Sequence, residues 1–191
     1  MGESVRPAVA EDADALGALH VRVWQVAYRG MKPDEYLEHL SVPRMQGWWA
    51  QQLAAAPEHQ SIRLVAEDDG GAVVGFVIAG PSRRSDLAEP AGEVYMLNVG
   101  PDAWGKGLGQ RLLRAATATL RAMGFTQAVL WVRPENSRAR RFYEAAGWWP
   151  DGTEFDGVIW DVAVHDVGYR TTLGDHPVLP VASGTASADT T

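Results

Sequence analysis

The stretch from Val99 to Leu113 constrains this chain most, because it joins a strand-like run, a glycine-rich loop and an amphipathic helix without a gap. Its loop carries three glycines, Gly105, Gly107 and Gly109. Glycine lets the backbone turn tightly and leaves its N–H groups uncovered. A helix start adds unpaired N–H donors and the positive end of the helix dipole. The stretch therefore predicts a strand–loop–helix unit that binds a phosphate or diphosphate.

Two better-known phosphate-binding loops fit this stretch poorly. The Walker loop needs G-x-x-x-x-G-K-[ST], and no such string occurs in the chain. The Rossmann fingerprint needs a glycine at position 110, where the chain has Gln110. It also needs a ribose-binding carboxylate after the next strand, 128–132, and this run is followed by Arg133 and Pro134. The sequence excludes a Walker site and disfavours a dinucleotide site.

The glycine spacing of 105–109, placed after Val-x-Pro at 99–101, resembles the acyl-CoA diphosphate loop of the GNAT superfamily of N-acetyltransferases. A second segment, 136–148, looks like a later motif of that superfamily: an Asn, a Tyr seven residues on, then Gly and an aromatic residue. The order and separation of the two motifs also fit. The resemblance is strongest over 93–149 and extends from about 5 to 173.

The resemblance implies an α/β fold with a mixed, mostly antiparallel central sheet flanked by helices. It also implies a V-shaped opening between strands 93–99 and 128–132, with acyl-CoA seated in the opening. We expect one domain over residues 1–173 and, from its small, polar composition, a disordered tail over 174–191. Periodicity and turn residues predict further strands at 5–9, 62–68, 72–79, 158–164 and 167–173, and helices from about 12 to 30 and at 33–40, 43–56, 108–123 and 137–146.

Acetyl-CoA is the co-substrate that the resemblance implies. The loop would hold its diphosphate through main-chain amides, and the pantetheine would pair with the backbone of 97–99 like an added strand. Loops of this family often begin with Gln or Arg where this chain has Trp104, so the contact at that position is open. Asn136 is also an ordinary residue for a helix N-cap, and both roles can hold at once. The expected cofactor-binding residues are Leu97, Asn98, Val99, Trp104, Gly105, Lys106, Gly107, Leu108, Gly109, Gln110 and Asn136.

Tyr143 and Glu93 are the candidate catalytic residues. The resemblance puts Tyr143 near the CoA sulfur, where a phenol with a pKa near ~10 stays protonated and can protonate the departing thiolate. The alternative is a core aromatic residue beside Phe142. Some members of the family carry a catalytic Glu at the place of Glu93, whereas others deprotonate the amine through ordered water. A solvated acid at a strand start is the structural alternative for Glu93.

Aromatic residues dominate the expected acceptor side. The chain has eight tryptophans, and the N-terminal helical region usually lines the acceptor pocket in this superfamily. Such walls can hold an aromatic amine, or a cation over a ring face. The expected substrate-binding residues are Trp24, Tyr28 and Tyr95, with Tyr36 close to them in the sequence.

Composition removes several classes of function. The net charge of −7 argues against a nucleic-acid surface. The absence of cysteine excludes disulfides and a cysteine nucleophile, so the acyl group passes directly to its acceptor or through another residue type. The five histidines show no metal-ligand spacing. No secretory signal or membrane-spanning run is visible, so we expect a cytoplasmic protein without membrane partners. A homodimer stays open.

The resemblance thus implies an N-acetyltransferase that passes the acetyl group of acetyl-CoA to a small amine, a protein N-terminus or a lysine. The alternative is a non-catalytic acyl-CoA-binding module, in which the loop persists without the chemistry.

Overall fold

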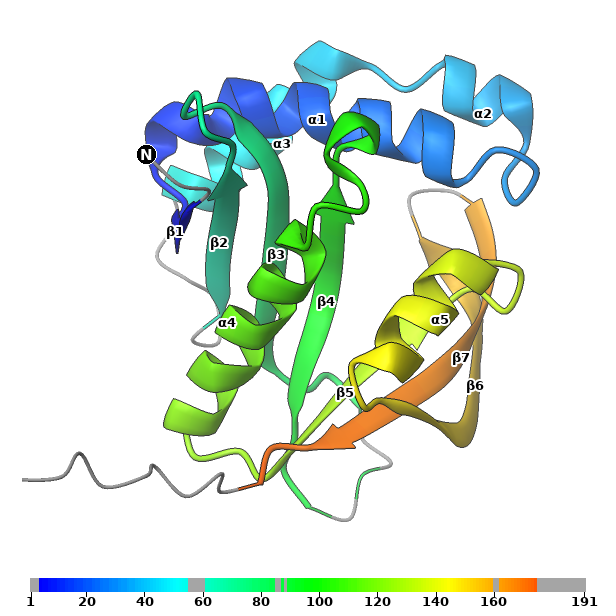
Figure 1. Cartoon of the computed structure of the whole chain (residues 1–191). Helices are drawn as coiled ribbons and strands as arrows, with labels where there is room; N and C mark the ends of the chain where they lie inside the picture. The colour runs from blue at the N-terminus through cyan, green and yellow to red at the C-terminus, as the bar shows by residue number, and fades with distance from the viewer. Residues whose placement is uncertain (1–3, 55–60, 85–86, 88, 160–161, 175–191) are drawn as a thin grey trace, which may run out of the picture.

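The computed structural model describes residues 4–54, 61–84, 87, 89–159 and 162–174 (Figure 1). The strands in this part of the chain form one sheet in the order β1-β2-β3-β4-β5-β7-β6. Neighbouring strands are antiparallel except β4 and β5, which run parallel. The expected mixed, mostly antiparallel sheet is confirmed. The strands are β1 (Ser4–Pro7), β2 (Ile62–Glu67), β3 (Val73–Pro81), β4 (Gly92–Val99), β5 (Gln127–Val132), β6 (Trp149–Ile159) and β7 (Val162–Thr172).

Helices cover both faces of this sheet. Those with α-helical geometry are α1 (Ala13–Ala27), α2 (Asp34–Glu38), α3 (Val42–Ala54), α4 (Leu108–Ala122) and α5 (Ser137–Ala145). Two short 3₁₀ turns are η1 (Ala10–Asp12) and η3 (Pro101–Ala103). Helices α4 and α5 lie on one face, and α1 and α3 lie on the other (Figure 1).

Strand β3 is buried on both faces, as its continuous apolar sequence predicts. Successive side chains of a strand point to opposite faces of the sheet. Phe76 and Ile78 pack with α1 and α3, whereas Val77 and Ala79 pack with α4. The domain therefore has two apolar cores that share β3 between them.

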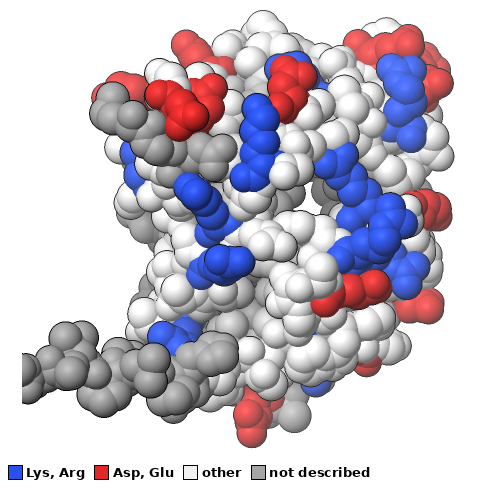
Figure 2. All heavy atoms as spheres, viewed as in Figure 1, with Lys and Arg blue, Asp and Glu red and all other residues white. Residues whose placement is uncertain are grey.

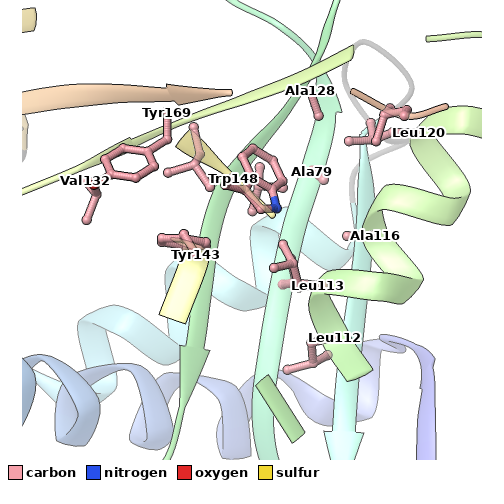
Figure 3. Packing of buried hydrophobic residues seen from close by; sticks show 14 of the residues in the cluster. Ala79, Leu112, Leu113, Ala116, Leu120, Ala128, Val132, Tyr143, Trp148 and Tyr169 are labelled. Atoms are coloured by element: carbon pink, nitrogen blue, oxygen red, sulfur yellow. The ribbon is translucent and has the colours of Figure 1, made fainter. Parts of the chain in front are cut away.

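The amphipathic pattern of α4 sets its orientation on the sheet (Figure 3). Leu112, Ala116 and Leu120 are fully buried, as predicted, and Met123 just beyond the helix is partly buried. Full burial of a leucine side chain contributes roughly 1.5–3 kcal/mol. This packing fixes the start of α4, and with it the glycine loop, against the end of β4.

Strands β4 and β5 begin side by side and then separate (Figure 1). They pair only at Gly92 with Ala128, Glu93 with Val129 and Val94 with Leu130. The next residue of β4, Tyr95, is an extra residue in the pairing with β3, which resumes at Met96. Such a bulge bends and twists its strand. The expected V-shaped opening between these two strands is confirmed.

The last hairpin differs from the sequence prediction. A single strand over 158–164 is wrong, because β6 ends at Ile159 and β7 begins at Val162; residues 160–161 lie outside the described residues. Strand β6 instead begins at Trp149, and its pairing with β7 jumps from Pro150 to Glu154. The residues between Pro150 and Glu154 have no partner in this register, so polar and apolar side chains do not alternate regularly along β6 and the sequence does not indicate a strand there. Helix α2 is shorter than the predicted 33–40, and the tail beyond Gly174 lies outside the described residues.

Candidate active site

A large cleft of about 1490 Å³ opens between β4 and β5 and continues under the end of α1. Its walls come from the glycine loop, α5 and the β6–β7 hairpin. Figure 2 shows this face hollowed between α4 and α5, with Lys and Arg side chains bordering the hollow on both sides. The separation of β4 and β5 thus leaves a space between the two strands in which a ligand can reach backbone groups.

The glycine loop presents a row of unpaired amides. Gly105 and Gly107 have φ values of 77° and 82°, which residues other than glycine rarely adopt. In the described part of the chain, the N–H groups of residues 105 to 110 donate no hydrogen bond. The first bond of α4 runs from the N–H of Arg111 to the carbonyl of Gly107, at 3.1 Å. Together with the dipole of α4, these donors form a site for an anion.

Trp104 contacts the end of β4. This is the contact that the sequence left open at position 104. The N–H of Gly100 donates to the carbonyl of Val74 on β3, so the carbonyl of Val99 faces away from β3. The indole N–H of Trp104 donates to this carbonyl at 2.6 Å. The guanidinium of Arg138 on α5 lies over the indole ring, 3.3 Å from its centroid. Trp104 therefore ties the loop to β4 and meets α5 across the cleft.

The cofactor-binding residues predicted from sequence lie together with one exception. Lys106 does not line the cleft and borders a smaller hollow beside Asp102. Asn136 caps α5, because its side-chain oxygen accepts from the N–H of Ala139 at 3.0 Å. The predicted residues that line the cleft are Leu97, Asn98, Val99, Trp104, Gly105, Gly107, Leu108, Gly109, Gln110 and Asn136.

Tyr143 projects from α5 into the cleft and is only 8% exposed. Its ring packs edge-on against Phe142 and tilted against Trp148. Burial raises the pKa of its phenol, so the group stays protonated near neutral pH. Among the described residues its hydroxyl has no hydrogen-bond partner. Tyr143 therefore packs as a core aromatic residue beside Phe142, and its hydroxyl is at the same time available as a proton donor.

Glu93 lies where β4 and β5 still pair, and it is 6% exposed. One carboxylate oxygen, Oε2, accepts from Ser82 Oγ at 3.0 Å and from the N–H of Arg83 at 2.8 Å. Within the described chain, Oε1 accepts no hydrogen bond, and the residue lines the cleft. The alternative of a solvated acid is wrong, because the side chain is buried and held in one orientation.

The predicted acceptor-side residues Trp24, Tyr28 and Tyr95 all line the cleft. The hydroxyl of Tyr95 donates to the carbonyl of Pro81, so Tyr95 offers its ring to the cleft. Tyr28 lies close enough to Tyr143 that its charge would raise the pKa of that phenol. These contacts place Tyr28 between Tyr143 and the end of α1.

Lys32 is the residue that the sequence analysis missed. It is 7% exposed and lines the cleft. Its ammonium lies 5.2 Å, 5.6 Å and 5.4 Å from the ring centroids of Trp24, Tyr28 and Tyr36. The sequence analysis expected these aromatic rings to bind the cation of a ligand. In the structure they bind the ammonium of Lys32 instead. A lysine with a tyrosine four residues away on each side was the available signal.

Two charged residues near Lys32 were also missed. Arg133 at the end of β5 and Asp166 on β7 both line the cleft, with Nε and Oδ1 3.6 Å apart. Burial raises the pKa of the Asp166 carboxyl, and Arg133 and Lys32 oppose this shift. These residues come from a distant part of the sequence, so only the fold brings them to Lys32.

The described residues contain no cluster of His, Asp or Glu that could hold a metal ion. No helix among them is long and apolar enough to cross a membrane.

Several solved structures have a similar fold. The N-acetyltransferase PaiA of Thermoplasma acidophilum, solved with coenzyme A, has a TM-score of 0.67 and 20% identity, over 90% of this chain and 99% of its own. The acetyltransferase yncA of Salmonella typhimurium, solved with acetyl-CoA, has a TM-score of 0.66 and 20% identity, over 93% of this chain and 97% of its own.

Sequence relatives agree with this fold. A probable N-acetyltransferase of Mycobacterium tuberculosis, Rv2775, is 27% identical over 87% of this chain and 91% of its own. A mycothiol acetyltransferase of Propionibacterium freudenreichii is 41% identical over 56% of this chain, and the match spans only 30% of that relative. Residues 21–148 match the Acetyltransferase (GNAT) family. Since this match covers most of the domain, the chain belongs to the GNAT family of acetyltransferases.

Proposed function

We propose that the chain transfers an acetyl group from acetyl-CoA to a primary amine by direct attack of the amine on the thioester. One observation carries the proposal: the loop with the unpaired amides of residues 105–110 lines, at every position but Lys106, the same cleft as Tyr143 and Glu93. An anion-binding loop beside a proton donor and a carboxylate is what a diphosphate-linked acyl donor requires. Membership of the GNAT family supports acetyl-CoA as that donor.

The open edge of β4 suits the pantetheine arm of coenzyme A. Residues two apart on a strand point their backbone groups to the same side, so Leu97 and Val99 both face the cleft. The carbonyl of Val99 already accepts from Trp104. The N–H of Val99 and both backbone groups of Leu97 are left for the amides of pantetheine. The arm would then run from the glycine loop along β4 toward Tyr95 and Glu93.

The amine must lose its proton before or during attack, because a free alkylamine has a pKa near ~10. Glu93 can accept that proton directly or through one water, since Oε1 is uncommitted and Oε2 is held by Ser82 and Arg83. The burial of Glu93 gives the carboxylate little water with which to share the proton. This arrangement supports Glu93, or a water held by it, as the base.

Tyr143 would stabilise the departing CoA thiolate. An ordinary thiol has a pKa near ~8.5, whereas burial raises the pKa of this phenol above its usual value. A hydrogen bond from the phenol to sulfur therefore costs less free energy than complete transfer of the proton. Electrostatic stabilisation of a developing anion in a buried site commonly gives 10²–10³-fold, on the order of 3–4 kcal/mol.

The test is release of free thiol from acetyl-CoA with a panel of primary amines. The proposal expects amine-dependent release and an acetylated amine in the mass spectrum. Coenzyme A binding without transfer to any amine would instead indicate the non-catalytic binding module. A protein that neither binds coenzyme A nor releases thiol would contradict both functions.

A further inference from the structure

The acceptor end of the cleft contains a buried, unpaired cation. Of the basic residues that line the cleft, Arg84 and Arg133 have carboxylate partners in Asp151 and Asp166. Two others, Arg83 and Arg138, are exposed at the surface. Among the basic residues in the described part of this lining, Lys32 alone combines burial with the absence of any hydrogen-bond or ion-pair partner.

Three aromatic faces hold the Lys32 ammonium in place. The ring centroids of Trp24, Tyr28 and Tyr36 all lie between 5.2 and 5.6 Å from Nζ, within reach of a cation–π attraction. This cage favours the charged form, whereas burial and the nearby Arg133 lower the pKa of the amine. The rings carry no net charge, so the cage orients the ammonium but does not neutralise its positive charge.

The local charge balance calls for one more negative group. Lys32 and Arg133 supply two positive charges, and the buried Asp166 supplies one negative charge, already shared with Arg133 at 3.6 Å. Glu135 and Glu154 also line the cleft but are exposed, so solvent screens them. The buried Glu93 is held by Ser82 and Arg83 and forms no ion pair with Lys32. A buried cation without a counterion is costly, and an anionic ligand group that binds it removes the cost.

The cluster lies next to the reacting centre. Lys32 lies over the ring of Tyr28, and the phenol of Tyr28 raises the pKa of Tyr143. One tyrosine thus separates the unpaired ammonium from the group expected at the CoA sulfur. A ligand anion on Lys32 would belong to the acceptor, because the diphosphate site lies at the start of α4, whereas the Lys32 cage is built on α1, which covers the opposite face of the sheet.

We propose that the amine acceptor carries a carboxylate and that Lys32 binds this carboxylate, so that the substrates are amino acids or peptides with a carboxylate near the reacting amine. The inference rests on the proposed acetyltransferase function and adds the class of acceptor. Lys32 acts as a specificity residue that positions the acceptor, while Glu93 and Tyr143 carry the proton steps.

The experiment compares free amino acids with their C-terminal amides as acceptors of the wild-type protein. The inference expects kcat/KM for the carboxylate to exceed that for the matched amide by at least tenfold. In Lys32→Met this ratio falls toward one, chiefly through KM of the carboxylate, while KM for acetyl-CoA stays within about twofold. Arg29→Met is the matched control, because it removes a positive charge near Lys32 from a residue outside the cleft, and it keeps the ratio.

A binding measurement separates failure of this inference from failure of the proposed function. N-acetyl amino acids and N-acetyl amino amides are titrated into the protein while the heat of binding is measured. Stronger binding of the carboxylates, lost in Lys32→Met, supports the inference even in a protein that transfers no acetyl group. Equal use of acids and amides by an active wild type overturns the inference and leaves the acetyltransferase intact. Equal loss of kcat for both acceptors in Lys32→Met also overturns it, because Lys32 would then serve the chemistry.

Discussion

At the scale of single residues, the account depends on the hydroxyl of Tyr143. Tyr143→Phe keeps the packing against Phe142 and Trp148 and removes only the proton donor. We expect kcat to fall about 10²-fold, in the usual range for loss of a buried donor, with little change in KM for acetyl-CoA. Steady-state kinetics measures this split. Unchanged kcat would show that Tyr143 is a core residue only.

The carboxylate of Glu93 makes a second prediction at this scale. Glu93→Gln can keep the contacts with Ser82 and Arg83 but cannot accept a proton. We expect kcat/KM to fall about 10²-fold near neutral pH, since general base catalysis commonly contributes 10²–10⁴-fold. The difference in kcat/KM between the variant and the wild type should become smaller at higher pH, because more of the amine substrate is then already unprotonated in solution. A variant that follows the wild-type profile at every pH would assign the base role to water alone.

At the scale of elements, the glycine loop and α4 act as one unit. Gly107 precedes α4 with φ of 82°, so Gly107→Ala strains the turn by about 1–2 kcal/mol. We expect both lower stability and roughly tenfold weaker binding of coenzyme A, because the strain falls on the turn that aims the amides. Gly47→Ala is the control, since Gly47 is exposed within α3 with open space around it. That change should stabilise the protein by about 0.5–1 kcal/mol. Equal effects of the two variants would contradict the role of the loop.

Elements set by local sequence could be predicted, and those set by distant contacts could not. The loop and α4 follow from glycine geometry and helical spacing, which act within a few residues. Strand β6 was missed over most of its length, because its pairing is irregular between Pro150 and Glu154. Lys32 was not singled out in the sequence, and the charged residues near it, Arg133 and Asp166, lie about 100 or more residues later in the chain. The contact of Trp104 with Val99 also depends on how the loop folds back.

At the scale of the whole molecule, a buried histidine links stability to pH. His20 is fully buried, packs against Trp24 and Phe76, and accepts from Trp49 at 3.3 Å. Burial lowers its pKa to about 4, from the value of 6.5 expected in the unfolded chain. The unfolded state therefore binds the proton first, so stability is full above pH 6.5 and falls as the pH drops toward 4.

This linkage predicts a loss of about 2 kcal/mol in the free energy of unfolding between pH 7 and pH 5 from His20 alone. Urea denaturation at the two pH values measures it. His20→Gln cannot titrate, so its stability should change less over the same interval by about that amount. An identical pH dependence in the two proteins would show that other groups cause the loss.

The sheet consists of strands β1 to β4 on one side and β5 to β7 on the other, and these two parts are joined at only three residue pairs of β4 and β5. The cleft forms because the two strands separate beyond these pairs. The central claim is that the amides of residues 105–110 in this cleft hold the diphosphate of coenzyme A. Calorimetric titration tests it most directly, with coenzyme A, with ADP, which carries a diphosphate without pantetheine, and with pantetheine, which lacks the diphosphate and the nucleotide. The account predicts one bound coenzyme A per chain, detectable binding of ADP and at least 10²-fold weaker binding of pantetheine than of coenzyme A. No heat of binding with coenzyme A, or equal affinity for coenzyme A and pantetheine, would contradict it.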